Sequence, residues 1–190
     1  MEPGQDRNIA ALTLPFRVCI FLYINLCKKN TKKLKKEKYF SKIQYEYMYV
    51  YYGEVMKINK IEQELLKLIT KAKDKNEVPI AALIVKNDKI ISKSYNKVNK
   101  SNNILDHAEI LVIKKASKKL HNWRLDDCDL YVTLEPCSMC KEVIRKSRIK
   151  NTYYFINQNE HLTEKEPNFI KIEDKINFSN KLTQFFKDKR

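Results

Sequence analysis

The sequence predicts an α/β protein in which a mixed β-sheet is covered by helices on both faces. Segments with helical and strand periodicity alternate along residues 56–190, which is the pattern of such a layered domain. An apolar content of 43% is enough to bury a core, and 190 residues suit one domain with an appendage. Only two glycines, five cysteines and no internal repeat exclude collagen-like, disulfide-dense and repeat classes.

The first elements of this region are a helix and a β-hairpin. Apolar residues at helical spacing predict an amphipathic helix over about residues 59–75. They are Ile58, Ile61, Leu65, Leu68, Ile69 and Ala72. An apolar run of strand length follows, Val78–Lys86, and a second strand is expected at Lys89–Tyr95. Asn87 and Asp88 between them tolerate positive φ, so the two strands are expected to pair antiparallel across a tight turn.

Helices and strands alternate over the rest of the chain. We expect a helix over residues 107–120, a strand at Asp129–Leu134 and a helix at Pro136–Lys146 that opens on its proline. A further strand at Asn151–Ile156 and a last helix at Phe178–Arg190 complete the pattern. Strands separated by helices pair in parallel, so the whole order gives a mixed sheet with helices on both faces.

Residues 1–55 have a different composition, because they hold both glycines and seven of the eleven tyrosines. The tripeptide Gly53-Glu54-Val55 directly precedes Met56, and its codons can contain a purine-rich tract like a bacterial ribosome-binding site. We therefore expect that the natural start is Met56. Residues 1–55 are then translated upstream sequence or an unstructured extension that lies outside the domain.

The run Ile9–Leu26 is the one candidate for a membrane segment. Pro15, Arg17 and Asn25 interrupt it, whereas a spanning helix needs about 20 mainly apolar residues. Acidic residues precede it, which is not the start of a signal peptide. We expect no membrane span, and an amino-terminal anchor remains the alternative.

The formal net charge of +15 invites a nucleic-acid partner, because basic surface attracts phosphate of any sequence. Of the 38 basic residues, however, 32 are lysine, and isoleucine and asparagine are abundant. An AT-rich genome produces the same residue usage. Charge alone therefore does not identify a polyanionic partner.

Two short motifs carry candidate metal chemistry, His107-x-Glu109 and Pro136-Cys137-x-x-Cys140. Residues three apart share a helix face, so both thiols can bind one ion, and a first helical turn lowers thiol pKa values. The histidine supplies a third ligand. Three protein ligands leave the fourth tetrahedral position open, as in a catalytic zinc site.

Glu109 completes this interpretation, because a carboxylate two residues from a ligating histidine can move the protons of metal-activated water. A lone C-x-x-C is more often a structural metal or redox site, but the joint pattern favours catalysis. A zinc-stabilised RNA-binding module would have no use for Glu109. The other cysteines, Cys19, Cys27 and Cys128, have no partner pattern, so we expect free thiols and a reducing, cytoplasmic location.

These motifs resemble the zinc-dependent cytidine/deoxycytidylate deaminase superfamily and, within it, the bacterial tRNA-specific adenosine deaminases. The resemblance extends over most of residues 56–190. It includes Glu77–Ala82, His107–Ile110, Asn122–Leu125 and Leu130–Cys137. It implies a three-layer α/β/α cytidine-deaminase-like fold with a mixed five-stranded sheet and helices on both faces.

The resemblance also implies an activity and a set of site residues. The activity is hydrolytic deamination of adenosine 34, the wobble position of a tRNA anticodon, by a cytoplasmic homodimer. In such enzymes zinc-activated water attacks C6 of the flipped-out adenine. The implied zinc ligands are His107, Cys137 and Cys140; Glu109 is the proton carrier, and Asn96 and the backbone near Ala82 and Ala108 bind the nucleoside. The implied dimer contact is the helix Pro136–Lys146 with the strands before and after it.

The substrate is where the chain departs from the family pattern. Ala81 replaces the family glycine, Asn103–Asp106 replaces D-P-T-A in a shorter loop, and the region after Ile156 is shortened. A deaminase of a free base or nucleoside, of the guanine or cytosine type, is therefore the alternative. Basic residues near the metal helix and in the last helix are candidate RNA contacts, or else simply solvated charges. Those singled out are Arg148, Lys187 and Arg190.

Overall fold

The fold is taken from a computed structural model that describes residues 40–158 and 168–189. The chain divides into two compact units, residues 1–52 and residues 53–190. The site and all packing described below belong to the second unit. The candidate anchor Ile9–Leu26, together with Cys19, Cys27 and Arg190, lies outside the described residues.

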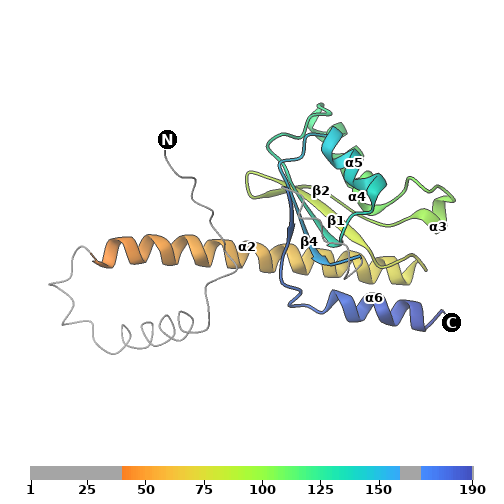
Figure 1. The fold of residues 1–190 in the computed structure, drawn as a ribbon, viewed down its shortest axis with the longest axis horizontal. Coiled ribbons are helices and arrows are strands. Elements are labelled where there is room, and N and C mark those ends of the chain that lie inside the picture. Colours follow the sequence, from red (N-terminus) through yellow and green to blue (C-terminus); the bar gives the residue numbers. More distant parts are fainter. Residues whose placement is uncertain (1–39, 159–167, 190) are drawn as a thin grey trace. The chain divides into compact units, whose positions relative to one another are not determined.

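The elements follow the predicted alternation (Figure 1). The helices are α2 (Phe40–Asp74), α3 (Val98–Ser101), α4 (Ala108–Leu120), α5 (Ser138–Lys146) and α6 (Phe178–Lys187). The strands are β1 (Ala81–Lys86), β2 (Lys89–Tyr95), β3 (Asp129–Leu134), β4 (Asn151–Ile156) and β5 (Phe169–Lys171). At the β1–β2 turn Asn87 and Asp88 have φ values of 48° and 59°, which confirms the predicted turn without glycine.

The five strands form one mixed sheet in the order β2-β1-β3-β4-β5. Strand β1 pairs antiparallel with both β2 and β3, whereas β3, β4 and β5 run parallel. Leu83 of β1 therefore lies between Lys93 of β2 and Tyr131 of β3. Parallel pairing brings the carboxyl ends of β3 and β4 to one edge, where the loops that carry the site begin.

Two hydrophobic cores lie on opposite faces of the sheet, which confirms the three-layer α/β/α fold (Figure 1). On one face Leu65 and Ile69 of α2 and Phe178 of α6 pack against the sheet. On the other face Val112 of α4 and Ile144 of α5 do the same. Burial of these side chains stabilises each layer by about 1.5–3 kcal/mol per large side chain.

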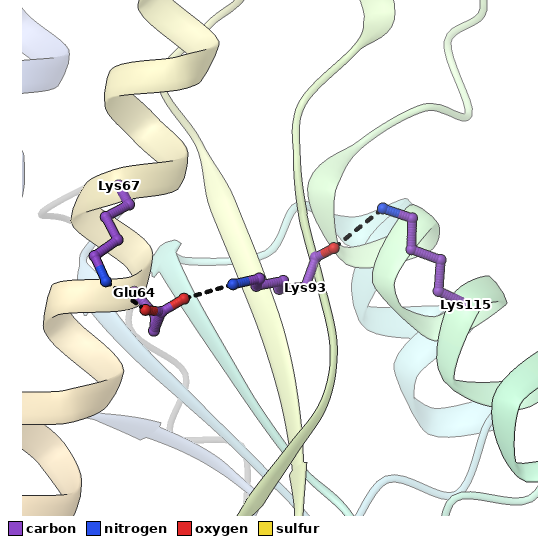
Figure 2. Close-up of polar contacts among 4 residues, drawn as sticks. All are labelled: Glu64, Lys67, Lys93 and Lys115. Atoms are coloured by element: carbon purple, nitrogen blue, oxygen red, sulfur yellow. Dashed lines mark hydrogen bonds and ion pairs between the residues drawn. The ribbon is translucent and has the colours of Figure 1, made fainter.

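Strand β2 is an edge strand that polar contacts tie to both helical layers (Figure 2). Glu64 of α2 accepts from Lys67 at 2.7 Å and from Lys93 of β2 at 2.6 Å. The backbone carbonyl of Lys93 accepts from Lys115 of α4 at 3.0 Å. Lys119 of α4 donates to the carbonyl of Ile91 at 3.1 Å. Lysines therefore occupy carbonyl groups that an open sheet edge leaves unpaired.

The structure corrects several predicted boundaries. Helix α2 begins at Phe40 and not near residue 59, so residues 40–55, expected to be unstructured or upstream sequence, are helical. Strand β1 begins at Ala81 and not at Val78, because Pro79 has no N–H to donate to a neighbouring strand. Helix α3 and strand β5 were not predicted, since four and three residues are too short to show a period.

The last helix was predicted to extend to Arg190, whereas α6 ends at Lys187. Among the residues that the structure describes, no helix combines the length and the apolar character that crossing a membrane requires. The start at Met56 concerns the native amino terminus and stays a prediction.

Candidate active site

The three predicted metal ligands come together where two helices begin. His107 is the N-cap residue of α4 and Cys137 the N-cap residue of α5, while Cys140 lies in the first turn of α5. Their donor atoms lie within 4.8 Å of one another, and within the described part of the chain no other group of His, Cys, Asp and Glu donors is arranged in this way. The predicted placement of both motifs at helix starts is therefore confirmed.

The spacing of these donors fits a tetrahedral ion. The Nδ1 atom of His107 lies 3.8 Å from Sγ of Cys137 and 3.4 Å from Sγ of Cys140. Zinc bonds of about 2.3 Å to sulfur and about 2.0 Å to nitrogen place such donors about 3.6 Å apart in a tetrahedron. The three side chains thus need little movement to bind one zinc ion.

Burial shapes the electrostatics of the ligands. It lowers the pKa of His107, which favours the neutral imidazole that ligates metals. Burial, with the nearby Glu109 carboxyl, raises the pKa of the Cys140 thiol, against the expected lowering by the helix terminus. Desolvation thus disfavours the thiolate at this position, and the positive charge of a bound metal ion would favour it.

Glu109 lies beside the ligands without joining their group. It occupies the first turn of α4 and is 4% exposed. Burial raises its pKa, and its carboxyl makes a hydrogen bond with the Cys140 thiol. A buried carboxyl with a raised pKa can hold a proton near neutral pH and release it to a bound substrate.

A cavity of about 200 Å³ adjoins the metal group. Its lining includes His107, Glu109 and Cys137, together with Asn96 from the end of β2. The other lining residues are Val78, Ile80, Val98, Asn99, Leu134, Glu135 and Gln158. The cavity thus combines apolar walls with a few polar groups, as small-molecule sites do.

Asn96 is held in place by Glu77. Its Nδ2 atom donates to Oε2 of Glu77 at 3.3 Å, and both side chains are buried. Because an ionised carboxylate only accepts hydrogen bonds, this contact fixes the amide group and leaves its Oδ1 atom as an acceptor. Glu77 also accepts from the backbone N–H groups of Asn99 and Lys100, at 3.2 and 2.7 Å.

Ala82 and Ala108, predicted to present their backbone to the substrate, are fully buried in the core between the sheet and α4. Neither is among the lining residues, although Ile80 and Glu109, close to them in sequence, are. Their role stays a prediction.

Sequence reasoning missed the part played by Glu135. It accepts from Lys141 at 2.8 Å and from the backbone N–H of Gln158 at 3.2 Å. Glu135 therefore fastens the loop after β4 to the start of the metal-binding helix α5. Its place directly before Pro136 and Cys137 was the available signal, but the contact with Gln158 depends on the fold.

The model of the MafB19-like deaminase family matches residues 56–190 of this chain. The chain belongs to this family. The match begins after the first fifty-five residues and spans the metal group, the cavity and both helical layers.

Relatives of this MafB19-like deaminase agree with the assignment. The tRNA-specific adenosine deaminase of Rickettsia bellii is 48% identical over 101 residues, which cover 52% of this chain and 70% of the relative. A solved structure from studies of A-to-I editing by tRNA:A34 deaminases is 39% identical, with a TM-score of 0.51 over 53% of this chain and 74% of that chain.

A guanine deaminase from Nitrosomonas europaea has a TM-score of 0.55 over 67% of this chain and 81% of its own. Its identity is 18%, so it is similar in fold alone. The deaminase fold expected from the sequence is thus confirmed.

Two of the predicted RNA contacts, Arg148 and Lys187, lie apart from the cavity lining, and the third, Arg190, is outside the described residues. Arg148 is exposed just after α5, with φ at 62°, and borders a shallow hollow with Trp123 and Arg145. Lys187 is exposed at the end of α6. Neither residue lines the cavity, so any contact with RNA would involve parts of the substrate beyond the reacting base.

Proposed function

We propose that this MafB19-like deaminase converts adenosine to inosine at position 34 of tRNA, with water as the second substrate and ammonia as the second product. The observation that carries hydrolytic deamination is one cavity lined by two of the three metal donors, His107 and Cys137, and by Glu109, a buried carboxyl whose pKa burial raises. The tRNA substrate rests on the relative at 48% identity and the A34 deaminase structure at 39%.

The ligands in this proposal are His107, Cys137 and Cys140, which fit one zinc ion. When bound, zinc lowers the pKa of a coordinated water to about 7 and so supplies a nucleophile near neutral pH. Glu109 would take one proton from the attacking water and give it to N1 of adenine. It would then carry the second proton of that water to the amino group, which leaves C6 as ammonia. Its burial keeps water from competing for these protons.

Asn96 accepts a hydrogen bond from the nucleoside in this proposal, because Glu77 already holds its amide nitrogen. Backbone groups near Ala82 and Ala108 complete the binding of the base. Arg148, Lys187 and Arg190 contact phosphates of the anticodon stem-loop. The role of Asn96 rests on its burial and its place in the cavity lining, and the roles of Arg148 and Lys187 rest on their surface exposure. The roles of Ala82, Ala108 and Arg190 rest on the likeness to the family alone.

The proposal extends to assembly and location. The enzyme is a cytoplasmic homodimer whose contact surface includes α5 with β3 and β4. The free thiols of Cys128, Cys137 and Cys140 support a reducing compartment. The deaminase domain comprises residues 56–190, with Met56 as the native start.

One assay separates this proposal from a free-base deaminase. The full chain is incubated with an anticodon stem-loop that bears adenosine 34, and inosine is measured by mass spectrometry of the digested RNA. Ammonia release is measured in parallel with free adenosine, cytosine and guanine. We expect inosine in the RNA, whereas ammonia from a free base without inosine in RNA would overturn the proposal.

A further inference from the structure

Two aliphatic side chains project into solvent beside the cavity. Ile104 is 67% exposed and Leu105 is 51% exposed. They lie in residues 97–106, which we term the rim loop. Exposed apolar side chains of this size are unremarkable singly, but a neighbouring pair next to a binding site indicates a contact surface.

The rim loop is held rigidly. Its two ends are joined by a hydrogen bond from Lys97 N to Asp106 O at 3.0 Å. Its tip is an Asx turn in which Oδ1 of Asn103 accepts from the N–H of Leu105 at 3.0 Å. Glu77 holds the helical part of the loop through two backbone N–H groups. The aliphatic pair is therefore presented in a fixed position, with little conformational entropy to lose on binding.

The loop continues the wall of the cavity. Val98 and Asn99, in its helical part, line the cavity, and the loop runs directly into the lining residue His107. Leu105 precedes His107 by two residues, so their Cα atoms are at most about 7 Å apart. A substrate group that leaves the cavity beside His107 therefore comes near Leu105.

The size of the cavity excludes the neighbours of the reacting base. Its volume of about 200 Å³ is below the range of about 300–1,000 Å³ that encloses a drug-sized ligand. A flipped-out adenine fills such a space, and the nucleotides on either side of it must then lie outside, on the rim. A free base has no part that reaches the rim, and a free nucleoside has no neighbouring base to place there.

We propose that Ile104 and Leu105 form an apolar platform on which an unpaired base next to the target adenosine packs. Unpaired bases offer flat apolar faces to such a platform, and protein surfaces bind single strands by base packing combined with positive charge. Lys97 and Lys100 supply that charge, because within the described residues neither has an ion pair with a carboxylate. Nζ of Lys97 lies 5.5 Å from the centroid of the Tyr95 ring. The platform rests on the proposed RNA activity and makes the flanking base part of substrate recognition.

The platform is tested with the double variant Ile104→Ser/Leu105→Ser in the zinc-loaded full chain. Its kinetics are measured on the stem-loop with adenosine 34 and on two versions in which one flanking nucleotide is abasic. We expect KM for the intact stem-loop to rise about five- to tenfold, somewhat less than the loss of one base–aromatic stack, with kcat nearly unchanged. One abasic substitution should raise KM for the parent protein and have little further effect on the variant.

Two controls keep a structural role apart from recognition. The exchange variant Ile104→Leu/Leu105→Ile retains an aliphatic surface and should have the KM of the parent protein. Ile170→Ser removes an exposed aliphatic side chain of β5 and should also leave KM unchanged. Equal KM values for the parent and the serine variant, with inosine formed by both, would overturn the platform alone. Absence of inosine with the parent protein would overturn the proposed function instead. Dissociation of a parent dimer by the serine variant, seen by sedimentation, would assign the pair to a second copy and also overturn the platform.

Discussion

Two glutamates on opposite faces of the sheet have carboxyl groups whose pKa values are shifted in opposite directions. Glu109, on the α4 face, is 4% exposed, and burial raises its pKa. Glu64, on the α2 face, has a side chain that is 18% exposed, and hydrogen bonds from Lys67 and Lys93 lower its pKa to about 2. One carboxyl is desolvated without a cationic partner, and the other has two.

The difference separates function from stability. A desolvated carboxyl without a cation costs folding free energy, which a protein tolerates where the proton has a use. A carboxylate between two lysines stabilises the fold modestly and does no chemistry. In the proposed function Glu109 on the α4 face therefore serves the reaction, whereas Glu64 on the α2 face supports the sheet, so substitutions at the two glutamates should affect different measurements.

The largest effect on turnover at full zinc content is expected from Glu109→Ala. Loss of a general acid and base reduces turnover by about 10²–10⁴-fold. Zinc content should stay near one per chain, because Glu109 does not belong to the donor group. Inosine formation and zinc analysis measure the two, and Glu64→Gln is the matched control that should retain activity. Near-native turnover by Glu109→Ala would show that the carboxyl is not the proton carrier.

Removal of the metal should affect both activity and stability. Cys140→Ala removes one of three donors and should abolish zinc binding and turnover. Chelation of zinc from the parent protein should lower the free energy of unfolding by about 4 kcal/mol if zinc was present at a thousand times its Kd. Cys128→Ala is the control. The buried thiol of Cys128 lies outside the donor group, so this variant should still bind zinc. A chelated protein with full activity would exclude a catalytic metal.

The elements of the fold differ in how well the sequence predicts them. The strands Lys89–Tyr95, Asp129–Leu134 and Asn151–Ile156 were predicted with the bounds that the structure has, because polar or turn residues border each of them. The start of α2 at Phe40 was missed, since the tyrosine-rich stretch before Met56 lacks an apolar period. Strand β5 is an edge of three residues whose pairing with β4 only the fold brings about.

The candidate site was predictable to the extent that it is local in sequence. The metal donors could be predicted from the spacing within His107-x-Glu109 and within Cys137-x-x-Cys140, because one helical turn sets the geometry inside each motif. The rest of the cavity is not local. Gln158 and Asn99 reach it from distant loops, and no residue pattern records that approach.

Leu65→Ala sharpens the comparison by damaging the α2 face alone. Leu65 is fully buried against the sheet, so the substitution should lower the free energy of unfolding by about 2–5 kcal/mol. Turnover per folded molecule should be unchanged, because no lining residue of the cavity comes from α2. Urea unfolding and inosine formation measure the two effects. Val112→Ala, on the α4 face and one turn from Glu109, is the counterpart that should lower both.

Glu64→Gln should have the smallest effect, and that effect should depend on pH. The folded pKa of about 2 lies below the ordinary value of 4.5, so the ion pairs stabilise the fold at neutral pH and lose their effect as pH falls from about 5 toward 2. At pH 7 the variant should lose at most about 1 kcal/mol, and at pH 3.5 less. Urea unfolding at pH 7, 5 and 3.5, with Lys93→Met and the double variant, isolates the coupling between Glu64 and Lys93. A loss that is the same at every pH would mean that Glu64 stabilises the α2 face by packing and not by charge.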